Sequence, residues 1–156
     1  MPSLRIVLPT EDLRPGLDEI RREFDVPGAF PPEVEQEAER AAASPAGDDE
    51  RRDARDLPRL TIDPPGSRDL DQAFGALRAG RGYRVHYAIA DLTPFVRPGG
   101  AVDAETWRRG ETGYMPDARA PLHPRVLSEG AASLLPAEDR PAVLWTIDLD
   151  ERGEPA

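Results

Sequence analysis

The sequence predicts an α+β fold in which a helical leader precedes a β-rich domain. Before residue 45, apolar residues recur at the three- and four-residue spacing of an amphipathic helix. After residue 60, apolar and polar residues alternate in short runs, which is typical of strands. The 156 residues include 13 glycines and 18 prolines, a content that favours many turns and short elements over a helical bundle.

The leader, residues 1–59, is predicted to form two helices followed by a linker. Thr10 is suited to cap a first helix over residues 11–24. The apolar face of this helix would carry Leu13, Leu17, Ile20 and Phe24. A second helix is expected from Pro32, because proline is tolerated in a first turn; having few large apolar residues, it is expected to be exposed. Residues 44–58 mix charge, glycine and proline and predict a charged linker.

The second part, residues 60–156, is predicted to be rich in strands. A short strand is expected over residues 59–63. Residues 72–78 and 83–91 predict a β-hairpin closed by a glycine-containing turn, since the second run alternates apolar with polar or small residues. Beyond the hairpin, the pattern predicts a helix over 103–112 and a strand from residue 141 that runs into a turn.

Composition and charge narrow the classes of function. The chain has no cysteine, which excludes a disulfide framework, a thiolate metal site and a cysteine nucleophile. Its net charge of −10 argues against a protein that coats nucleic acid through a basic surface, but leaves a metal-assisted nuclease open. No segment has the pattern of a secretory signal or a membrane span, so a cytoplasmic protein without membrane contact is expected. No protein partner is predicted.

The stretch TIDPPGSRDLDQAF, residues 61–74, places three aspartates around a Pro-Pro-Gly turn. Asp63 is expected to end the short strand, and Asp69 and Asp71 stand two apart, so in an extended segment their side chains share a face. Carboxylates that close repel one another unless a cation lies among them, and oxygen ligands suit magnesium, manganese or calcium. The stretch therefore predicts a metal site. The alternative is a polar turn in which Asp69 pairs with Arg68 and the other carboxylates face water.

Other candidate residues have both a functional and a structural interpretation. Tyr114 lies in GETGYMPD, where an aromatic ring could stack on a nucleobase or serve as an ordinary core or rim residue. His86 and His123 lack the paired spacing of metal ligands and are expected to be structural. Four arginines could contact phosphate or simply lie on the solvated surface, namely Arg108, Arg109, Arg119 and Arg125.

Three segments together resemble the opening half of the catalytic RNB domain of the ribonuclease II/ribonuclease R family. They are TIDPPGSRDLDQAF, YAIADLTPFVRPGGAVD and RRGETGYMPDARAPLHPRVLSEGAASLLPAEDRPAVLWTIDLD, which follow one another in the family's motif order. The resemblance implies an RNB-type exoribonuclease domain over residues 60–156 that ends after its first part. It also implies a metal-dependent, hydrolytic 3′-to-5′ exoribonuclease that degrades single-stranded RNA with Mg²⁺ and releases nucleoside 5′-monophosphates.

The resemblance implies roles for individual residues. Asp63, Asp69 and Asp71 match the family's metal-binding aspartates; Asp69 and Asp71 would be catalytic, and Asp71 is the one most closely tied to catalysis. Gln72 stands where the family has a fourth aspartate. Its amide oxygen implies a weaker metal ligand or a water contact, and leaves the choice between Mg²⁺ and Mn²⁺ open. Tyr114 matches the family tyrosine that stacks on bases near the RNA 3′ end.

Two larger departures from the family pattern lie in the segments around the matched part. Residues 1–59 form a helical leader where the family commonly has cold-shock RNA-binding domains, and the resemblance ends before the family's second half. A half domain is expected to leave strand edges and core surface uncovered. Gln72 and the short length of the matched part favour one alternative function, a non-catalytic RNA-binding protein on the same scaffold. A structural or regulatory domain whose acids bind calcium or nothing is a further alternative.

Overall fold

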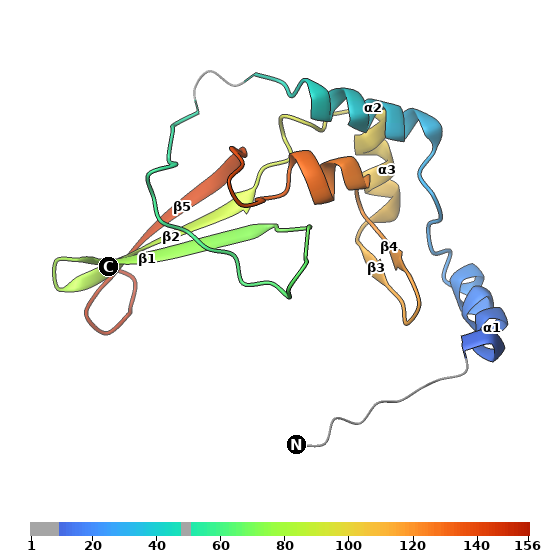
Figure 1. Ribbon diagram of the computed structural model, residues 1–156, viewed down its shortest axis with the longest axis horizontal. Helices are drawn as coiled ribbons and strands as arrows, with labels where there is room; N and C mark the ends of the chain where they lie inside the picture. The colour runs from blue at the N-terminus through green and yellow to red at the C-terminus, as the bar shows by residue number, and fades with distance from the viewer. Residues whose placement is uncertain (1–9, 48–50) are drawn as a thin grey trace.

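The computed structural model of the chain describes residues 10–47 and 51–156. Its helical elements are α1 (Thr10–Glu23), α2 (Pro32–Ala43), α3 (Ala101–Arg109) and the π-helical turn η1 (Leu127–Ala131). Its strands are β1 (Gln72–Ala79), β2 (Gly82–Ala90), β3 (Gly113–Tyr114), β4 (Arg119–Ala120) and β5 (Ala142–Leu149). Figure 1 shows the long strands gathered on one side of the molecule and the helices on the other, which confirms the predicted α+β fold.

The long strands form an antiparallel sheet in the order β1-β2-β5. β1 and β2 are the predicted hairpin, and their turn consists of Gly80 and Arg81, with Gly80 at a positive φ of 60° that suits a tight hairpin turn. The register places Phe74 opposite Tyr87, and Tyr87 opposite Trp145 of β5. The predictions of the hairpin and of the last strand are therefore confirmed.

The two faces of this sheet differ in burial. One face carries Ala73, His86 and Ala88, which are all buried. The opposite face carries large apolar side chains that remain partly exposed, and we call it the open face: Phe74, Ile89, Val143, Trp145 and Ile147. The alternation in β2 was predicted correctly, but its more apolar side is the less buried one. Within the described residues, the expected uncovered core surface is thus found on the sheet.

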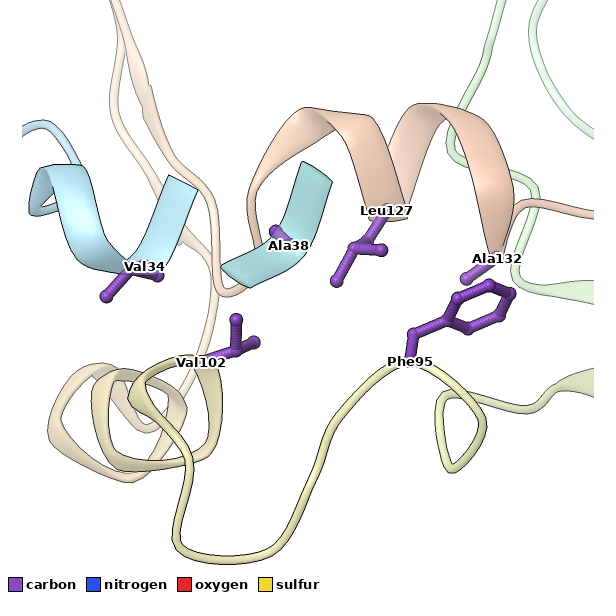
Figure 2. Close-up of a cluster of buried hydrophobic side chains, with 6 residues drawn as sticks. All are labelled: Val34, Ala38, Phe95, Val102, Leu127 and Ala132. Carbon is purple, nitrogen blue, oxygen red and sulfur yellow. The ribbon is translucent and has the colours of Figure 1, made fainter. Parts of the chain in front are cut away.

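The main hydrophobic core lies beside the sheet, where α2, α3 and η1 meet (Figure 2). Its buried side chains are Val34, Ala38, Phe95, Val102, Leu127 and Ala132. The prediction that α2 is exposed is therefore wrong. Val34 and Ala38 lie one helical turn apart, and their small size lets α2 approach its neighbours closely without large apolar residues. Glu37, also on α2, accepts hydrogen bonds from the first N–H groups of α3, at Ala101 (3.0 Å) and Val102 (3.3 Å).

The strand predicted over residues 59–63 is not formed. Leu60 alone pairs with the sheet, exchanging two backbone hydrogen bonds of 3.0 and 2.9 Å with Phe74. Just before it, the chain passes over β1 at Gly75, where an added Cβ would stand only 2.0 Å from the carbonyl oxygen of Pro58. The segment therefore lies across β1 and meets the strand edge at one residue, so that Asp63 follows irregular backbone and not a strand end.

Helix α1 covers nearly the whole predicted range, and Thr10 is its first residue; the side chain of Thr10 lies outside the described residues. Its apolar face stays largely exposed at Leu13, Ile20 and Phe24. Arg21 connects the helix to the turn between β3 and β4 through an ion pair with Asp117. None of the helices in the described part of the chain has the length and apolar character needed to cross a membrane.

Candidate functional site

The four residues predicted to bind metal line one pocket. Asp63, Asp69, Asp71 and Gln72 border a pocket of about 380 Å³, together with Leu60, Ile62, Ala73, Phe74 and Tyr87. Asp69 and Asp71 lie immediately before β1 and Gln72 begins it, whereas Asp63 arrives on the segment that touches β1 at Leu60. The structure therefore brings the four side chains together, and their roles as metal ligands stay a prediction.

A buried serine fixes the backbone that carries these aspartates. Ser133 is 1% exposed; its hydroxyl donates to the Arg68 carbonyl oxygen (2.6 Å) and accepts from the Leu70 N–H (2.9 Å). The N–H of Leu134 then donates to the Leu70 carbonyl oxygen (2.9 Å). The loop after η1 is thus hydrogen-bonded to the backbone of both neighbours of Asp69. Sequence reasoning missed Ser133, although its place in the LSEGAASL segment was an available signal.

A further backbone bond ties the acidic segment to the sheet. The N–H of Ala90, the last residue of β2, donates to the carbonyl oxygen of Asp71 at 2.9 Å. Because the backbone of residues 68–71 is held at several points, the side chains of Asp69 and Asp71 are presented to the pocket from fixed positions. Such fixed backbone is a requirement for a site that must place charged groups reproducibly.

The acids of the pocket influence one another electrostatically. Burial raises the pKa of Asp71 above its ordinary value, and the negative charges of Asp69 and Asp63 raise it further, while the charge of Arg119 opposes the rise. The three carboxylates are therefore near enough to disfavour their common ionisation. A cation that entered the pocket would relieve this repulsion.

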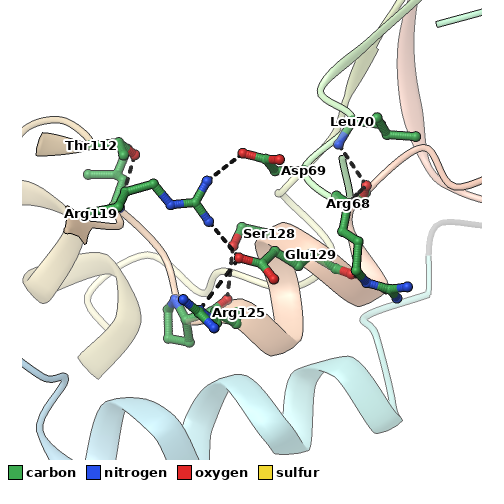
Figure 3. Close-up of polar contacts among 11 residues, drawn as sticks. Arg68, Asp69, Leu70, Thr112, Arg119, Arg125, Ser128 and Glu129 are labelled. Atoms are coloured by element: carbon green, nitrogen blue, oxygen red, sulfur yellow. Dashed lines mark hydrogen bonds and ion pairs between the residues drawn. The ribbon is translucent and has the colours of Figure 1, made fainter. Parts of the chain in front are cut away.

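An arginine on another element contacts one of the pocket's acids (Figure 3). Arg119 of β4 pairs with Asp69 through Nη1 and Oδ2 at 2.6 Å, and with Glu129 through Nη2 and Oε1 at 2.5 Å. The predicted alternative pair of Asp69 with Arg68 is not formed, because Arg68 instead donates to the Glu129 carbonyl oxygen at 3.4 Å. Arg119 lies 50 residues after Asp69, so no local pattern in the sequence could identify it as the partner.

Gln72 is engaged by the neighbouring strand. The hydroxyl group of Tyr87 on β2 donates a hydrogen bond to Oε1 of Gln72. This oxygen is the atom that would have to serve as a metal ligand. The contribution of Gln72 to cation binding is therefore in competition with a hydrogen bond inside the sheet.

The donor set fits a hard divalent cation in its chemistry, but it is not assembled as a cage. Carboxylate oxygens are the ligands that Mg²⁺ and Mn²⁺ prefer. Across residues 10–47 and 51–156, however, no three His, Asp or Glu side chains are arranged so that they could hold an ion. Arg119 engages one oxygen of Asp69, while Asp63 and Asp71 form no salt bridge with any described residue. Cation binding would therefore require these carboxylates to move closer together.

Tyr114 lies on the β3–β4 hairpin and not in the pocket lining. It is 76% exposed, so the interpretation as a core residue is wrong and the ring is accessible for stacking. In the ladder between β3 and β4, Tyr114 stands directly opposite Arg119. Because Arg119 binds Asp69, the hairpin that presents Tyr114 is connected to the acidic pocket.

Two of the four arginines considered for phosphate contact are bound elsewhere. Glu105 pairs with Arg108 at 2.5 Å and with Arg109 at 2.8 Å. Arg109 is buried and donates a hydrogen bond to the Gly28 carbonyl oxygen at 2.9 Å. Its guanidinium carbon Cζ lies 3.6 Å from the centroid of the Phe30 ring. Arg109 therefore holds the chain before α2 against α3 and is not available to a phosphate.

The two histidines have structural surroundings. His86 is buried in the sheet, with its Nδ1 at 3.3 Å from the hydroxyl oxygen of Thr146 on β5. Burial lowers the pKa of His123, because it disfavours the charged form of the ring. Neither histidine lines the acidic pocket.

Comparison with known proteins identifies the family. Residues 51–156 match the family model of the RNB domain. Ribonuclease R of Vibrio cholerae is 36% identical over 151 residues, which cover 92% of this chain and 18% of that protein. Exoribonuclease 2 of Erwinia tasmaniensis is 40% identical over 108 residues, which cover 69% of this chain and 17% of that protein.

Solved structures agree with these relatives. RNase R of Mycoplasma genitalium, in complex with ribose-methylated single-stranded RNA, gives a TM-score of 0.83 at 27% identity and covers 94% of this chain and 23% of its own. Its complex with double-stranded RNA gives a TM-score of 0.79 at 26% identity. The chain thus spans about a fifth of the length of the relatives described here. By sequence and by fold, the chain belongs to the RNB-domain family of exoribonucleases, the ribonuclease II/ribonuclease R family.

Proposed function

We propose that this chain provides the metal-binding part of a hydrolytic 3′-to-5′ exoribonuclease that degrades single-stranded RNA to nucleoside 5′-monophosphates. The observation that carries the proposal is the convergence of Asp63, Asp69 and Asp71 on one pocket, in a chain of the RNB-domain family. The RNA complexes of the Mycoplasma genitalium RNase R support RNA as the substrate class.

The carboxylates have distinct tasks in this proposal. Asp63, Asp69 and Asp71 would hold a divalent cation, Mg²⁺ or Mn²⁺, with Asp69 and Asp71 acting at the reacting phosphate. A cation bound there supplies charge stabilisation to the phosphate and lowers the pKa of an attacking water. The bonds of Ser133 to the backbone of residues 68–70 hold the main chain around Asp69, so that only side chains would have to move when a cation binds.

Tyr114 would bind the RNA beside the pocket. Its exposed ring can stack on a base near the 3′ end, and stacking tolerates any base because every base has a π-face. The net charge of −10 means that the acidic chain itself offers little general attraction for phosphate, so binding would rest on such local contacts and on the cation.

One observation favours a second candidate function, RNA binding without cleavage. Gln72 occupies the position of the family's fourth aspartate, and its amide oxygen already accepts a hydrogen bond from Tyr87. The pocket then has three carboxylates, and the oxygen at the fourth position is neutral and shared with a hydrogen bond. If three ligands do not hold the cation firmly enough, the scaffold would retain RNA and leave it intact.

Cleavage of 5′-labelled single-stranded RNA tests the proposal. The assay uses this chain, and any longer natural polypeptide that contains it, with Mg²⁺, Mn²⁺ or a chelator. We expect a ladder that shortens from the 3′ end and depends on the metal. In Asp71→Asn, cleavage should fall by at least about 100-fold, because a charged group at the reacting phosphate is lost, while RNA binding persists.

The possible results separate the two functions. A metal-dependent ladder that is absent in Asp71→Asn supports the exoribonuclease. RNA retention in a gel-shift assay, without shortening under any metal, supports the binding protein. Equal cleavage by Asp71→Asn and the parent would contradict the role of Asp71, whatever the activity of the chain.

A further inference from the structure

Arg119 is the cation that the fold itself brings to Asp69, one of the acids that line the pocket. Its guanidinium group lies between two carboxylates, with 2.6 Å to Asp69 and 2.5 Å to Glu129 (Figure 3). The arginine and its two partners are all partly shielded from water, with side-chain exposures of 26%, 36% and 22%. Arginine keeps its charge at any ordinary pH, so this positive charge is permanent.

The pairing is uneven across the pocket. Asp69 uses Oδ2 for Arg119, and its Oδ1 forms no hydrogen bond with any described side chain. Asp63 and Asp71 have no salt bridge with a described residue. Among the described residues, Asp69 is therefore the one acid of the pocket that is paired with a permanent positive charge, and Arg119 divides that charge between Asp69 and Glu129.

We propose that Arg119 is the resident counter-cation of the pocket, which positions Asp69 while no divalent ion is bound and competes with that ion for its carboxylate. The inference rests on the proposed role of Asp69 as a metal ligand. Two positive charges on one carboxylate repel each other, so the arginine lowers the affinity of the pocket for a divalent cation. In return, it reduces the repulsion among the acids in the metal-free protein.

Glu129 allows Arg119 to release Asp69 and to pair with it again. The second carboxylate holds the guanidinium group from its other side, and Arg125 approaches the same Oε1 of Glu129 at 3.5 Å. If Asp69 turns toward a bound ion, Arg119 retains a partner and is not left as an uncompensated charge, which would be costly in a partly buried place. Because Arg119 stands opposite Tyr114 in the ladder, one hairpin carries both the resident charge and the exposed tyrosine.

Titration with Mn²⁺ alone, followed by calorimetry and by the electron spin resonance of free Mn²⁺, tests the proposal without using activity. Arg119→Gln removes the competing charge and should bind Mn²⁺ about three- to tenfold more tightly than the parent, as expected for one like charge at close range in partly screened surroundings. Arg125→Gln is the matched control: it removes the same formal charge beside Glu129 but does not contact Asp69, and its side chain is 75% exposed. Its affinity should stay within about twofold of the parent.

The possible results test the competition between Arg119 and the ion, and separate it from the metal-dependent function. Unchanged or weaker Mn²⁺ binding in Arg119→Gln, or an equal gain in Arg125→Gln, overturns the competition. If Arg119→Gln does not fold by circular dichroism, Glu129→Gln decides instead. Arg119 then has Asp69 as its remaining carboxylate partner, so Mn²⁺ binding should weaken, and unchanged binding overturns the inference. If the folded parent itself binds no Mn²⁺, the competition is overturned for this chain, whereas the metal-dependent function is decided separately by the cleavage assay with the longer polypeptide.

Discussion

Asp71 shows how the fold places a single carboxyl group in the pocket at a cost to stability. Its backbone is tied to β2 through Ala90, so the side chain cannot easily leave its neighbours. Burial and the nearby Asp69 and Asp63 raise its pKa, which means that ionised Asp71 is less favourable in the folded chain than in the unfolded one. A perturbed acid in a pocket is typical of a functional site.

Asp71→Asn is therefore expected to stabilise the metal-free protein at neutral pH. Because the folded pKa is raised, the folded state binds a proton more tightly, so this group's stabilising contribution is present below its ordinary pKa of 3.8 and is lost as pH rises through the folded pKa. Asparagine does not ionise and escapes this loss. Thermal melts in chelator should show a higher melting temperature for the variant near neutral pH, and a difference that shrinks toward about pH 3.

Glu105→Gln provides a control of opposite sign. The hydrogen bond from Arg108 is the largest cause that lowers the pKa of Glu105, and Arg109 adds to it. The stability from this group is present above its unfolded pKa and is lost as pH falls through the folded pKa. Glu105→Gln should thus melt lower than the parent at neutral pH. A gap between Asp71→Asn and the parent that did not change with pH would contradict the electrostatic explanation.

The sequence predicts the acids of the site much better than their partners. The three aspartates lie within nine residues, and their spacing around a Pro-Pro-Gly turn indicates convergence directly. Ser133 and Arg119 lie far from these aspartates in the sequence. Their contacts with the acidic segment depend on how η1 and the β3–β4 hairpin pack. Tertiary packing alone creates these contacts, so local pattern cannot indicate them.

At the scale of elements, local sequence patterns predict the structure correctly where a single pattern covers a whole helix or strand. The β1–β2 hairpin combines alternating residues with a glycine turn, and both signals agree with the pairing that forms. They fail for α2, because burial of Val34 and Ala38 depends on the neighbours that cover them, and small residues give a weak apolar signal. They fail also at residues 59–63, where Gly75 was the overlooked signal of a close backbone approach.

Gly75→Ala tests whether the crossing segment depends on this missing side chain. The new methyl group would meet the Pro58 carbonyl oxygen at 2.0 Å, so the segment that leads to Asp63 must move outward. We expect a loss of about 1–3 kcal/mol in the free energy of unfolding, measured by urea denaturation, as is usual when a tight contact is overfilled. If Asp63 is a metal ligand, Mn²⁺ affinity should fall in the same variant.

Gly28→Ala is a suitable control for this change. Nothing lies within 4 Å of a Cβ built at Gly28, so the same substitution adds a methyl group without a clash. Its free energy of unfolding should stay within about 1 kcal/mol of the parent. Equal stability of Gly75→Ala and Gly28→Ala would mean that the crossing segment does not press against β1 in solution.

At the scale of the whole molecule, the open face of the sheet and the acidic pocket adjoin. Phe74 belongs to the open face and also lines the pocket, and Ile62 of the pocket is 81% exposed. Apolar surface of this kind is uncommon on a protein that functions alone. Anything that covered the open face would therefore also form a wall of the pocket.

Tryptophan fluorescence can test whether the open face of the sheet is exposed to water in solution. Trp145 on this face is 57% exposed, and Trp107 on the outside of α3 is 82% exposed. Trp107→Phe and Trp145→Phe each leave one tryptophan, and acrylamide should quench the two variants to a similar degree, because water reaches both indoles. Emission should also shift little when either variant unfolds in urea. Strong protection of Trp145 in dilute solution, with Trp107 still quenched, would show that the open face is covered and would contradict the arrangement described here.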